Sequence, residues 1–374
     1  MSEKTPLARK DLKVGMKVPW NIFDLEGRKL LAKGQEIRSD KMLDEMCQYV
    51  LFHDVPNEQH NAIKSTQGKL NVFDITAKYI KRIEKIYSEL ENQNPECIEL
   101  INNLAKDILV LCIREPDGIL GVCHVKNEYH YTHYHSLQCA YISVMIARRA
   151  GFSDYECYCL SAAAILANVS MQHTQEKLTK QTEPLTQAQN NIILKHPEKS
   201  VELLRSINYD NENVLDIIHE HHERCDGSGY PNGYKRENIC RGALILGIAD
   251  SYGAMVSTEN YHKQFAINEV LQYFFKDKGS LYETHFSLLL IKVLTVFPPG
   301  CFVKLTNGET AIVVFRGKMS PMEPYLKSVL GKNGEEYANP LIRDLSIHKF
   351  DIQTICVNES EKPLNYSQIW GYTT

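Results

Sequence analysis

An almost unbroken helical pattern of apolar residues between about residues 119 and 294 constrains the fold of this chain most strongly. Apolar positions there recur mostly every three or four residues, the spacing that lines one face of an α-helix. Such a segment folds into an all-α helical bundle. The pattern predicts helices over 137–149, 154–167, 185–195, 197–207, 214–222 and 241–257.

A different pattern precedes the helical segment. Short apolar runs cut by glycine over residues 12–52 predict short strands and hairpin turns. Ser39 or Asp40 can accept the free amides of a helix over 41–47, and a strand is expected at 49–52. We therefore expect a small N-terminal α+β domain over residues 1–55.

Residues 56–70 are polar and predict a linker, and residues 71–118 then form two amphipathic helices separated at Pro95. These helices either pack on the domain that follows them or pair between the protomers of a homodimer. Packing on the following domain, expected over 119–296, is favoured.

The chain changes pattern again after the helical segment. Two apolar runs, 302–305 and 311–315, flank Asn307-Gly308, a strong signal for a β-hairpin. Residues 297–374 are therefore expected to be a β-rich appendage. The predicted fold class is mainly α, with an all-α helical bundle, a small N-terminal α+β domain and a C-terminal β-hairpin appendage.

Charge and cysteine content exclude several function classes. The net charge of −4 and the pI near 6.4 provide no basic field for nucleic acid. The eleven cysteines are dispersed, which favours reduced thiols over a disulfide framework. The apolar stretch 286–297 is short and interrupted by Lys292, so no membrane span is expected. We predict a cytoplasmic protein.

Residues 221–231 concentrate side chains that bind metal ions. The run reads His-His-Glu-Arg-Cys-Asp-Gly-Ser-Gly-Tyr-Pro, with two adjacent imidazoles and two carboxylates. Neutral imidazole and carboxylate are the usual ligands of Zn, Mn and Fe. The composition of this run therefore predicts a metal site.

The same run, with its His-His-Glu-x-x-Asp-Gly-x-Gly-Tyr-Pro pattern, resembles the signature of the HD-GYP family of bacterial metal-dependent cyclic di-GMP phosphodiesterases. The specific part of the resemblance covers about residues 119–294. It implies an all-α HD-type domain. It also implies metal ligands at the family positions, which here hold His135, His196, His221, His222 and Asp250.

The chain departs from the family pattern at several functional positions. Residues 163–171 resemble the family's Ala-Ala-x-Leu-His-Asp-Ile-Gly-Lys helix, but Ala167 and Asn168 replace the His-Asp dyad and Met171 replaces the Lys. Glu259 occupies a family Arg position, and Tyr131 replaces a Glu. The resemblance implies that the dyad Asp bridges two metals, a role that neutral Asn168 fills poorly. Met171 and Glu259 replace two cationic side chains of the family pattern, which weakens the affinity for phosphate.

The surviving ligands leave the cofactor open between two alternatives. Either His196, His221 and His222 hold one divalent transition metal, Fe, Mn or Zn, or the histidines are vestigial and no metal is retained. Cys157 and Cys159 could also bind metal, but buried helix thiols are the favoured interpretation.

The intact Gly229-Tyr230-Pro231 loop leads to the functional hypothesis. In the HD-GYP family this loop is implicated in contacts with diguanylate cyclase domains of the GGDEF type. The preferred hypothesis is a catalytically degenerate regulatory or scaffold protein of cyclic di-GMP signalling, with weak or absent nucleotide binding. The alternatives are a residual metal-dependent phosphodiesterase and a sensor that binds cyclic di-GMP without cleaving it.

Overall fold

The computed structural model describes residues 4–7, 12–23, 29–47, 51–54, 70–179, 181–257, 265–317, 320, 322–345, 351–356 and 363–372. The chain divides into two compact units. One comprises residues 1–70 with 152–156, and the other comprises residues 71–151 with 157–374. The predicted linker 56–70 lies, except for Leu70, outside the described residues.

In its described residues, the N-terminal unit is a small antiparallel sheet with one helix. The sheet has the order β1-β4-β2-β3, and Val18, Ile22 and Ile37 are fully buried in its core. Ser39 accepts the amide of Met42 at 3.2 Å, so it caps the helix as predicted. The predicted α+β class of this unit is confirmed. The elements are β1 (Lys4–Leu7), β2 (Ile22–Phe23), β3 (Lys29–Leu31), α1 (Asp40–Cys47) and β4 (Leu51–Asp54).

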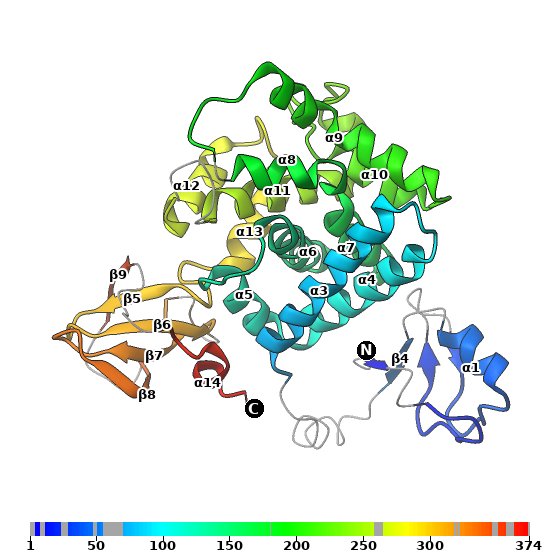
Figure 1. Cartoon of the computed structure of the whole chain (residues 1–374). Helices are drawn as coiled ribbons and strands as arrows, with labels where there is room; N and C mark the ends of the chain where they lie inside the picture. The colour runs from blue at the N-terminus through cyan, green and yellow to red at the C-terminus, as the bar shows by residue number, and fades with distance from the viewer. Residues whose placement is uncertain are drawn as a thin grey trace. The chain divides into compact units, whose positions relative to one another are not determined.

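The second unit is built around a helical bundle with α6 at its centre (Figure 1). Nearly every residue of α6 is buried, because α3, α4, α5, α11 and α13 all pack against it. The predicted all-α bundle is therefore confirmed. Its helices are α3 (Val72–Glu91), α4 (Cys97–Arg114), α5 (Pro116–His124), α6 (Tyr131–Arg149), α7 (Asp154–Leu166), α8 (Gln172–Leu178), α9 (Gln187–Ser206), α10 (Glu212–Glu220), α11 (Arg241–Val256), α12 (Ile267–Asp277) and α13 (Thr284–Leu294).

The two amphipathic helices before the bundle, α3 and α4, pack on it. The buried Tyr87 hydroxyl of α3 lies 2.9 Å from Ser136 Oγ of α6 and donates to the Ile165 carbonyl of α7. The buried Tyr87 hydroxyl thus finds its hydrogen-bond partners on α6 and α7, which makes α3 part of the bundle core. This is the arrangement that the sequence favoured over pairing between protomers.

Helix α9 differs from the prediction of two helices over 185–195 and 197–207. It runs without interruption through Pro197. Proline cannot donate to the carbonyl four residues earlier, which is that of Ile193. His196 Nδ1 donates to that carbonyl instead, at 2.7 Å. This hydrogen bond from the imidazole satisfies the Ile193 carbonyl in place of the missing amide, so the helix continues through Pro197.

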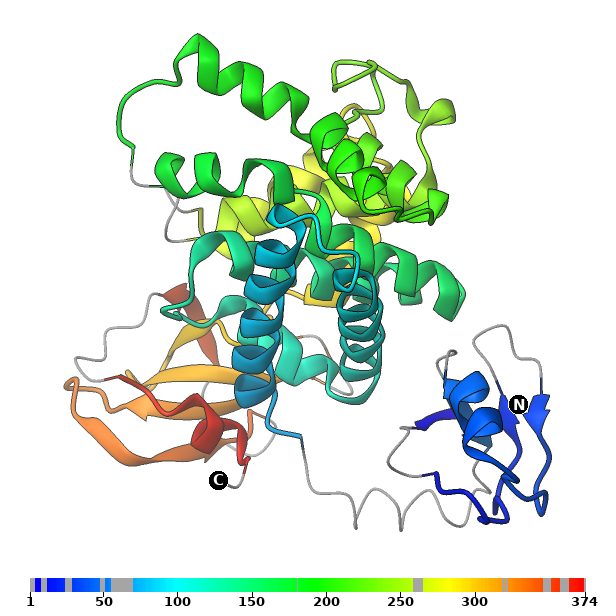
Figure 2. The same cartoon turned by 45° about the vertical axis from the view of Figure 1, so that its right-hand side comes forward.

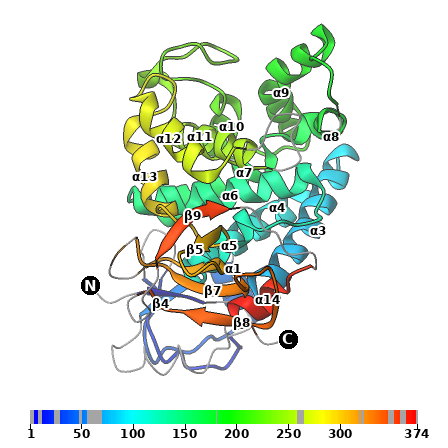
Figure 3. The same ribbon diagram turned by 90° about the vertical axis from the view of Figure 1, so that its left-hand side faces the viewer.

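The C-terminal region forms a larger sheet than the predicted hairpin. The Asn307-Gly308 turn joins β5 to β6 as predicted, with Gly308 at a φ of +90°. Three further strands extend the pair to an antiparallel sheet of order β8-β7-β6-β5-β9, which lies against α5 at one end of the bundle (Figure 3). The strands are β5 (Phe302–Leu305), β6 (Thr310–Phe315), β7 (Tyr325–Leu330), β8 (Glu336–Arg343) and β9 (Ile352–Cys356).

The end of the described chain returns to the first helix of the bundle. The short helix α14 (Tyr366–Trp370) lies beside α3 (Figure 2), and the Trp370 ring meets the Phe73 ring edge-on at 5.3 Å. A Cβ on Gly121 of α5 would lie 2.4 Å from the Trp370 ring. The absence of a side chain at Gly121 therefore lets Trp370 pack directly on the backbone of α5.

The described residues contain neither a candidate membrane span nor a disulfide. No helix among them is long and apolar enough to span a bilayer. The cysteines described there are free thiols, and Cys157 and Cys159 are buried in α7, as the core interpretation expects.

Candidate metal centre

Three histidines from two parts of the chain converge in the bundle. His196 lies within α9, whereas His221 and His222 follow directly after α10. Each of the three presents one ring nitrogen within 4.8 Å of the others, and the Nε2 atoms of His196 and His221 are 3.3 Å apart. The structure thus brings together three of the five ligands expected from the sequence.

Backbone carbonyls fix the tautomers of two of these rings. His196 Nδ1 contacts the Ile193 carbonyl at 2.7 Å, and His221 Nδ1 contacts the Ile218 carbonyl at 2.6 Å. Because a carbonyl can only accept, both Nδ1 atoms carry the proton. In the neutral rings, both Nε2 atoms therefore direct lone pairs at each other. Their 3.3 Å separation matches the edge of a tetrahedral shell with Zn–N bonds of about 2.0–2.1 Å.

Burial keeps these imidazoles neutral. It disfavours the charged form and lowers the pKa of His196 to about 3, with the neighbouring His221 ring adding to the effect. Burial also lowers the pKa of His221 and holds the pKa of His222 well below its ordinary value. Neutral imidazole is the form that binds a metal ion, so the cluster fits a divalent cation at neutral pH.

The other two expected ligands form a separate pair between α6 and α11. His135 Nε2 donates to Asp250 Oδ1 at 2.9 Å, and His135 is buried. Burial alone would lower the pKa of His135, but Cys139, Tyr131 and the Asp250 carboxylate raise it well above its usual value. Burial likewise opposes the ionisation of Asp250, yet the hydrogen bond from His135 and the nearby imidazoles hold its pKa well below the usual range. An ionised pair results.

Cys139 lies in the same group and was not singled out in the sequence. Its Sγ is 3.6 Å from His135 Nε2, and His135, Cys139 and Asp250 present ligand atoms within 4.8 Å of one another. The signal that could have identified it is its spacing, because residues four apart share one helix face.

Neutral or apolar side chains occupy the positions of the family dyad. Ala167 and Asn168 are buried at the end of α7, where the Ala167 carbonyl accepts from Ser200 Oγ of α9 at 2.9 Å. Asn168 Oδ1 is among the described buried oxygens without a hydrogen-bond partner. Met171 is half-buried before α8. Tyr131 stacks on His135, with ring centroids 5.3 Å apart. Glu259 lies outside the described residues.

The Gly229-Tyr230-Pro231 loop packs on the histidine cluster. The Tyr230 ring stacks on His222 at a centroid distance of 4.7 Å and meets His196 edge-on at 6.3 Å. A Cβ on Gly229 would lie 2.4 Å from the Arg224 backbone nitrogen, so only glycine permits this close approach. Tyr230 is half-buried, and one face of its ring packs on the cluster through His222.

The two carboxylates of the 221–231 run hold the loop. Buried Glu223 accepts the backbone amides of Asn232 at 2.7 Å and of Tyr234 at 2.9 Å. Exposed Asp226 accepts the amide of Ser228 at 2.9 Å. Neither carboxylate belongs to the ligand groups found among the described residues. The imidazoles of the run thus provide the metal-binding chemistry, and the carboxylates provide the scaffold.

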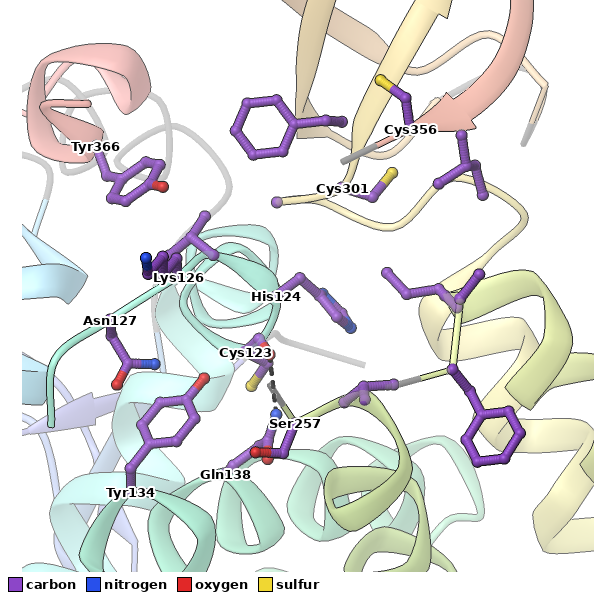
Figure 4. A pocket seen from close by; sticks show the side chains of 18 of the residues that line it. Cys123, His124, Lys126, Asn127, Tyr134, Gln138, Ser257, Cys301, Cys356 and Tyr366 are labelled. Atoms are coloured by element: carbon purple, nitrogen blue, oxygen red, sulfur yellow. Dashed lines mark hydrogen bonds between the residues drawn. The ribbon is translucent and has the colours of Figure 1, made fainter. Parts of the chain in front are cut away.

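A cavity of about 580 Å³ lies beside this region, between α5, the start of α6 and the C-terminal sheet (Figure 4). Lys126, Asn127 and Tyr134 lie along one side, and Gln138 Nε2 donates to the Cys123 carbonyl at 2.9 Å. Tyr131 of its lining stacks on His135, one of the predicted ligands.

Comparison with known proteins identifies relatives of the bundle. Residues 125–285 match the model of the HD domain. The cyclic di-GMP phosphodiesterase PA4108 of Pseudomonas aeruginosa is 24% identical over 226 residues, covering 60% of this chain and 54% of that protein. The cyclic di-GMP phosphodiesterase PdeB of Borreliella burgdorferi is 27% identical over 201 residues, covering 54% and 52%. The chain spans about half the length of these curated relatives.

A solved structure shares the fold. It is that of Bd1817, a HDG"Y"P protein from Bdellovibrio bacteriovorus, with a TM-score of 0.53 and 14% sequence identity. The match covers 78% of this chain and 99% of the other. At this identity the likeness concerns the fold alone.

Proposed function

Residues 125–285 are an HD domain of the HD-GYP-like family, and from that premise we propose that the chain is a catalytically degenerate regulatory protein of bacterial cyclic di-GMP signalling. Its role is binding. The Gly229-Tyr230-Pro231 loop is the proposed contact for a partner, of which a GGDEF-type diguanylate cyclase is the expected class.

The proposal rests on the neutral side chain of Asn168. A carboxylate shared by two cations offsets their repulsion and holds them at the separation that in-line attack on a phosphodiester requires. Asn168 occupies the bridging position with a neutral amide, its Oδ1 is buried without a partner, and Ala167 beside it offers no ligand atom. Two-metal hydrolysis therefore lacks its bridge.

The histidine cluster is proposed to retain one divalent ion, Fe, Mn or Zn. His196 and His221 are held by Ile193 and Ile218 so that their Nε2 atoms face each other as acceptors. When bound, such an ion supplies a Lewis acid that lowers the pKa of a coordinated water. In this proposal the ion orders the three rings, of which Tyr230 stacks on His222 and meets His196 edge-on.

Residual phosphodiesterase activity is the second candidate function. It is favoured by the names of the relatives, PA4108 and PdeB, both cyclic di-GMP phosphodiesterases. The three-imidazole cluster, which fits a single ion, also supports it. Such an enzyme would work with one ion in place of a pair.

Two measurements separate these functions. Purified protein with Mn²⁺ or Fe²⁺ and cyclic di-GMP is expected to release no linear pGpG or GMP above the level of the His221→Ala variant. Turnover that depends on metal and is abolished by His221→Ala would refute the regulatory proposal. A purified GGDEF domain is expected to bind the wild type and not the Tyr230→Ala variant.

Calorimetric titration tests the third hypothesis, a nucleotide sensor. Cyclic di-GMP is expected to give only heat of dilution, because Met171 replaces a phosphate-binding lysine. A saturable heat without turnover would replace the scaffold role by a sensor role.

A further inference from the structure

We propose that the cavity between α5, the start of α6 and the C-terminal sheet is a binding site for a small aromatic anion that carries an N–H or O–H donor. This inference goes beyond the proposed function, which gives the cavity no role. None of the five predicted metal ligands lines the cavity. A cavity that binds nothing would therefore leave the proposed roles of the loop and the histidine cluster unchanged.

The cavity has one wall from the bundle and another from the C-terminal region (Figure 4). The second wall comes from the start of β5, the end of β9 and α14. Its side chains are Cys301, Phe302, Ile355, Cys356 and Tyr366. These residues lie outside 125–285, the stretch that matches the HD domain. The matched domain therefore does not form this site by itself.

The size and the aromatic lining of the cavity suit a flat organic molecule. Its volume of about 580 Å³ lies within the roughly 300–1,000 Å³ that is usual for small-molecule sites. Planar ligands pack well on aromatic side chains, because rings attract one another in stacked and edge-on arrangements. The rings that line the cavity are those of Tyr129, Tyr131, Tyr134, Phe265, Phe302 and Tyr366.

Lys126 provides a positive charge in the wall that no described carboxylate pairs with. Neighbouring His124 adds no charge, because desolvation lowers its pKa to about 4. Its Nδ1 donates to the Pro299 carbonyl at 2.9 Å, and its Nε2 accepts from the Tyr252 hydroxyl at 2.6 Å. The Glu269 carboxylate already accepts a backbone amide at the start of α12, at 2.9 Å. An unpaired ammonium beside an apolar cavity favours a ligand with an anionic group.

Lys126 also lies where this cavity meets a second hollow. That hollow has a volume of about 320 Å³, and Lys126, Asn127, Tyr129 and Tyr366 line both spaces. A ligand whose ring lies in the larger cavity can therefore place its acidic group at the junction, next to the Lys126 ammonium.

Gln138 indicates the hydrogen-bond donor of the ligand. Its side chain lines the cavity, and the residue is only 3% exposed. Its Nε2 donates to the Cys123 carbonyl at 2.9 Å, but no described residue donates to its Oε1. An acceptor withdrawn from water without a donor is unfavourable. An N–H or O–H group on the ligand would satisfy this oxygen.

The fluorescent probe anilinonaphthalene sulfonate tests the site, because it combines fused aromatic rings, an N–H group and a sulfonate. Titration of the full chain is expected to give a saturable rise in fluorescence from one site. Lys126→Gln should raise the Kd roughly two- to fivefold, since the ion pair is partly exposed to solvent. Lys126→Arg keeps the cation and should bind like the wild type. Lys276→Gln, on the exposed end of α12, is the matched control.

A second variant tests the cavity itself. Cys356 lies at the end of β9, the edge strand of the sheet, and the Cys356→Trp variant places an indole in the cavity. This variant is expected to lose the saturable signal, whereas Cys356→Ser should retain it. Circular dichroism and the thermal transition check that both variants fold. The substitutions of exposed Lys126 test the site independently of any change in the sheet.

The outcomes separate a built site from binding to exposed apolar surface. Fluorescence that rises without saturation, or that is equal in wild type, Lys126→Gln and folded Cys356→Trp, would overturn the site. Displacement of the probe by cyclic di-GMP would assign the cavity to the nucleotide and would also overturn a separate site for aromatic anions. A saturable signal that is weakened by Lys126→Gln, kept by Lys126→Arg and lost in Cys356→Trp supports the site.

Discussion

The ring of Tyr230 stacks on the ring of His222, with centroids 4.7 Å apart and planes inclined by 23°. His222 belongs to the histidine cluster, and Tyr230 belongs to the loop proposed to contact a partner. The two sites therefore share one packed interface. Ligand binding at either site is expected to change the affinity of the other, because such coupling is reciprocal.

The Tyr230→Ala variant is expected to bind zinc or manganese more weakly than the wild type. A stacked aromatic pair contributes about 0.5–1.5 kcal/mol, which corresponds to a roughly 2- to 12-fold rise in Kd. Isothermal titration calorimetry measures the change. Tyr234→Ala is the matched control, since Tyr234 is exposed in the same loop. Equal affinities in all three proteins would contradict the coupling.

The Pro197→Ala variant is expected to be more stable and to bind metal less tightly. Alanine donates its amide to the Ile193 carbonyl, which raises the free energy of unfolding by up to about 3 kcal/mol. His196 Nδ1 then competes for that carbonyl, and loss of such a supporting contact weakens metal binding about tenfold. Urea denaturation and metal titration measure the two effects. Exposed Lys199→Ala serves as the control on the same helix, and tighter metal binding by the proline variant would refute the account.

The Asn168→Asp variant is expected to be destabilised without metal and rescued by it. Asp places a charge where the Asn168 oxygen is already buried and unpartnered, which costs more than the roughly 1–3 kcal/mol of an unsatisfied neutral group. A divalent ion removes that cost, so added Mn²⁺ should raise the melting temperature of the variant more than that of the wild type. The control is Asn191→Asp on the exposed face of α9. Identical Mn²⁺-induced shifts of the melting temperature in Asn168→Asp and Asn191→Asp would place Asn168 away from the metal.

The C-terminal sheet is expected to lose stability in acid through Glu309. Hydrogen bonds from Arg343, at 2.6 Å, and from Ser328 lower the pKa of Glu309 to about 2. A lowered pKa in the folded state stabilises the protein above the ordinary value of 4.5, and this stability is lost as the pH falls from 4.5 towards 2.

Denaturation of Glu309→Gln at several pH values tests this effect. The variant should be less stable than the wild type at pH 7, and the difference should shrink across the acid window. Glu202→Gln, at a carboxylate with a side chain 61% exposed, should show a difference near zero throughout. A constant deficit of Glu309→Gln from pH 7 to pH 3 would exclude the ionised pair as its cause.

Local periodicity was sufficient to predict most of the bundle. Helices α7, α10 and α11 lie close to their predicted ranges, because their apolar spacing already specifies a buried face. The fold class and the family resemblance are confirmed. The domain boundaries and the five expected metal ligands stay predictions, although the structure gathers those ligands into two groups.

The remaining features depend on contacts between distant residues. Pro197 alone predicts a break, and only the position of the His196 ring shows why the helix continues. Strand β9 pairs with β5, which lies far from it in the sequence, through a register that no short motif encodes. Strands β7 and β8 are joined by a short connection with Asn333-Gly334, the same hairpin signal as Asn307-Gly308, which the sequence analysis did not use. The scaffold role of Glu223 depends on the amides of the loop that folds over it, which its place beside two histidines in the sequence does not indicate.

The contact of Trp370 with Phe73 and Gly121 can form only late in synthesis of the chain. Helices α3 and α5 leave the ribosome long before α14, and until Trp370 arrives their shared face stays exposed to water. An apolar face uncovered during translation is a site for chaperones and for aggregation. Completion of the bundle therefore waits for nearly the last described turn of the polypeptide, so a nonsense mutation shortly before Trp370 leaves an incomplete core.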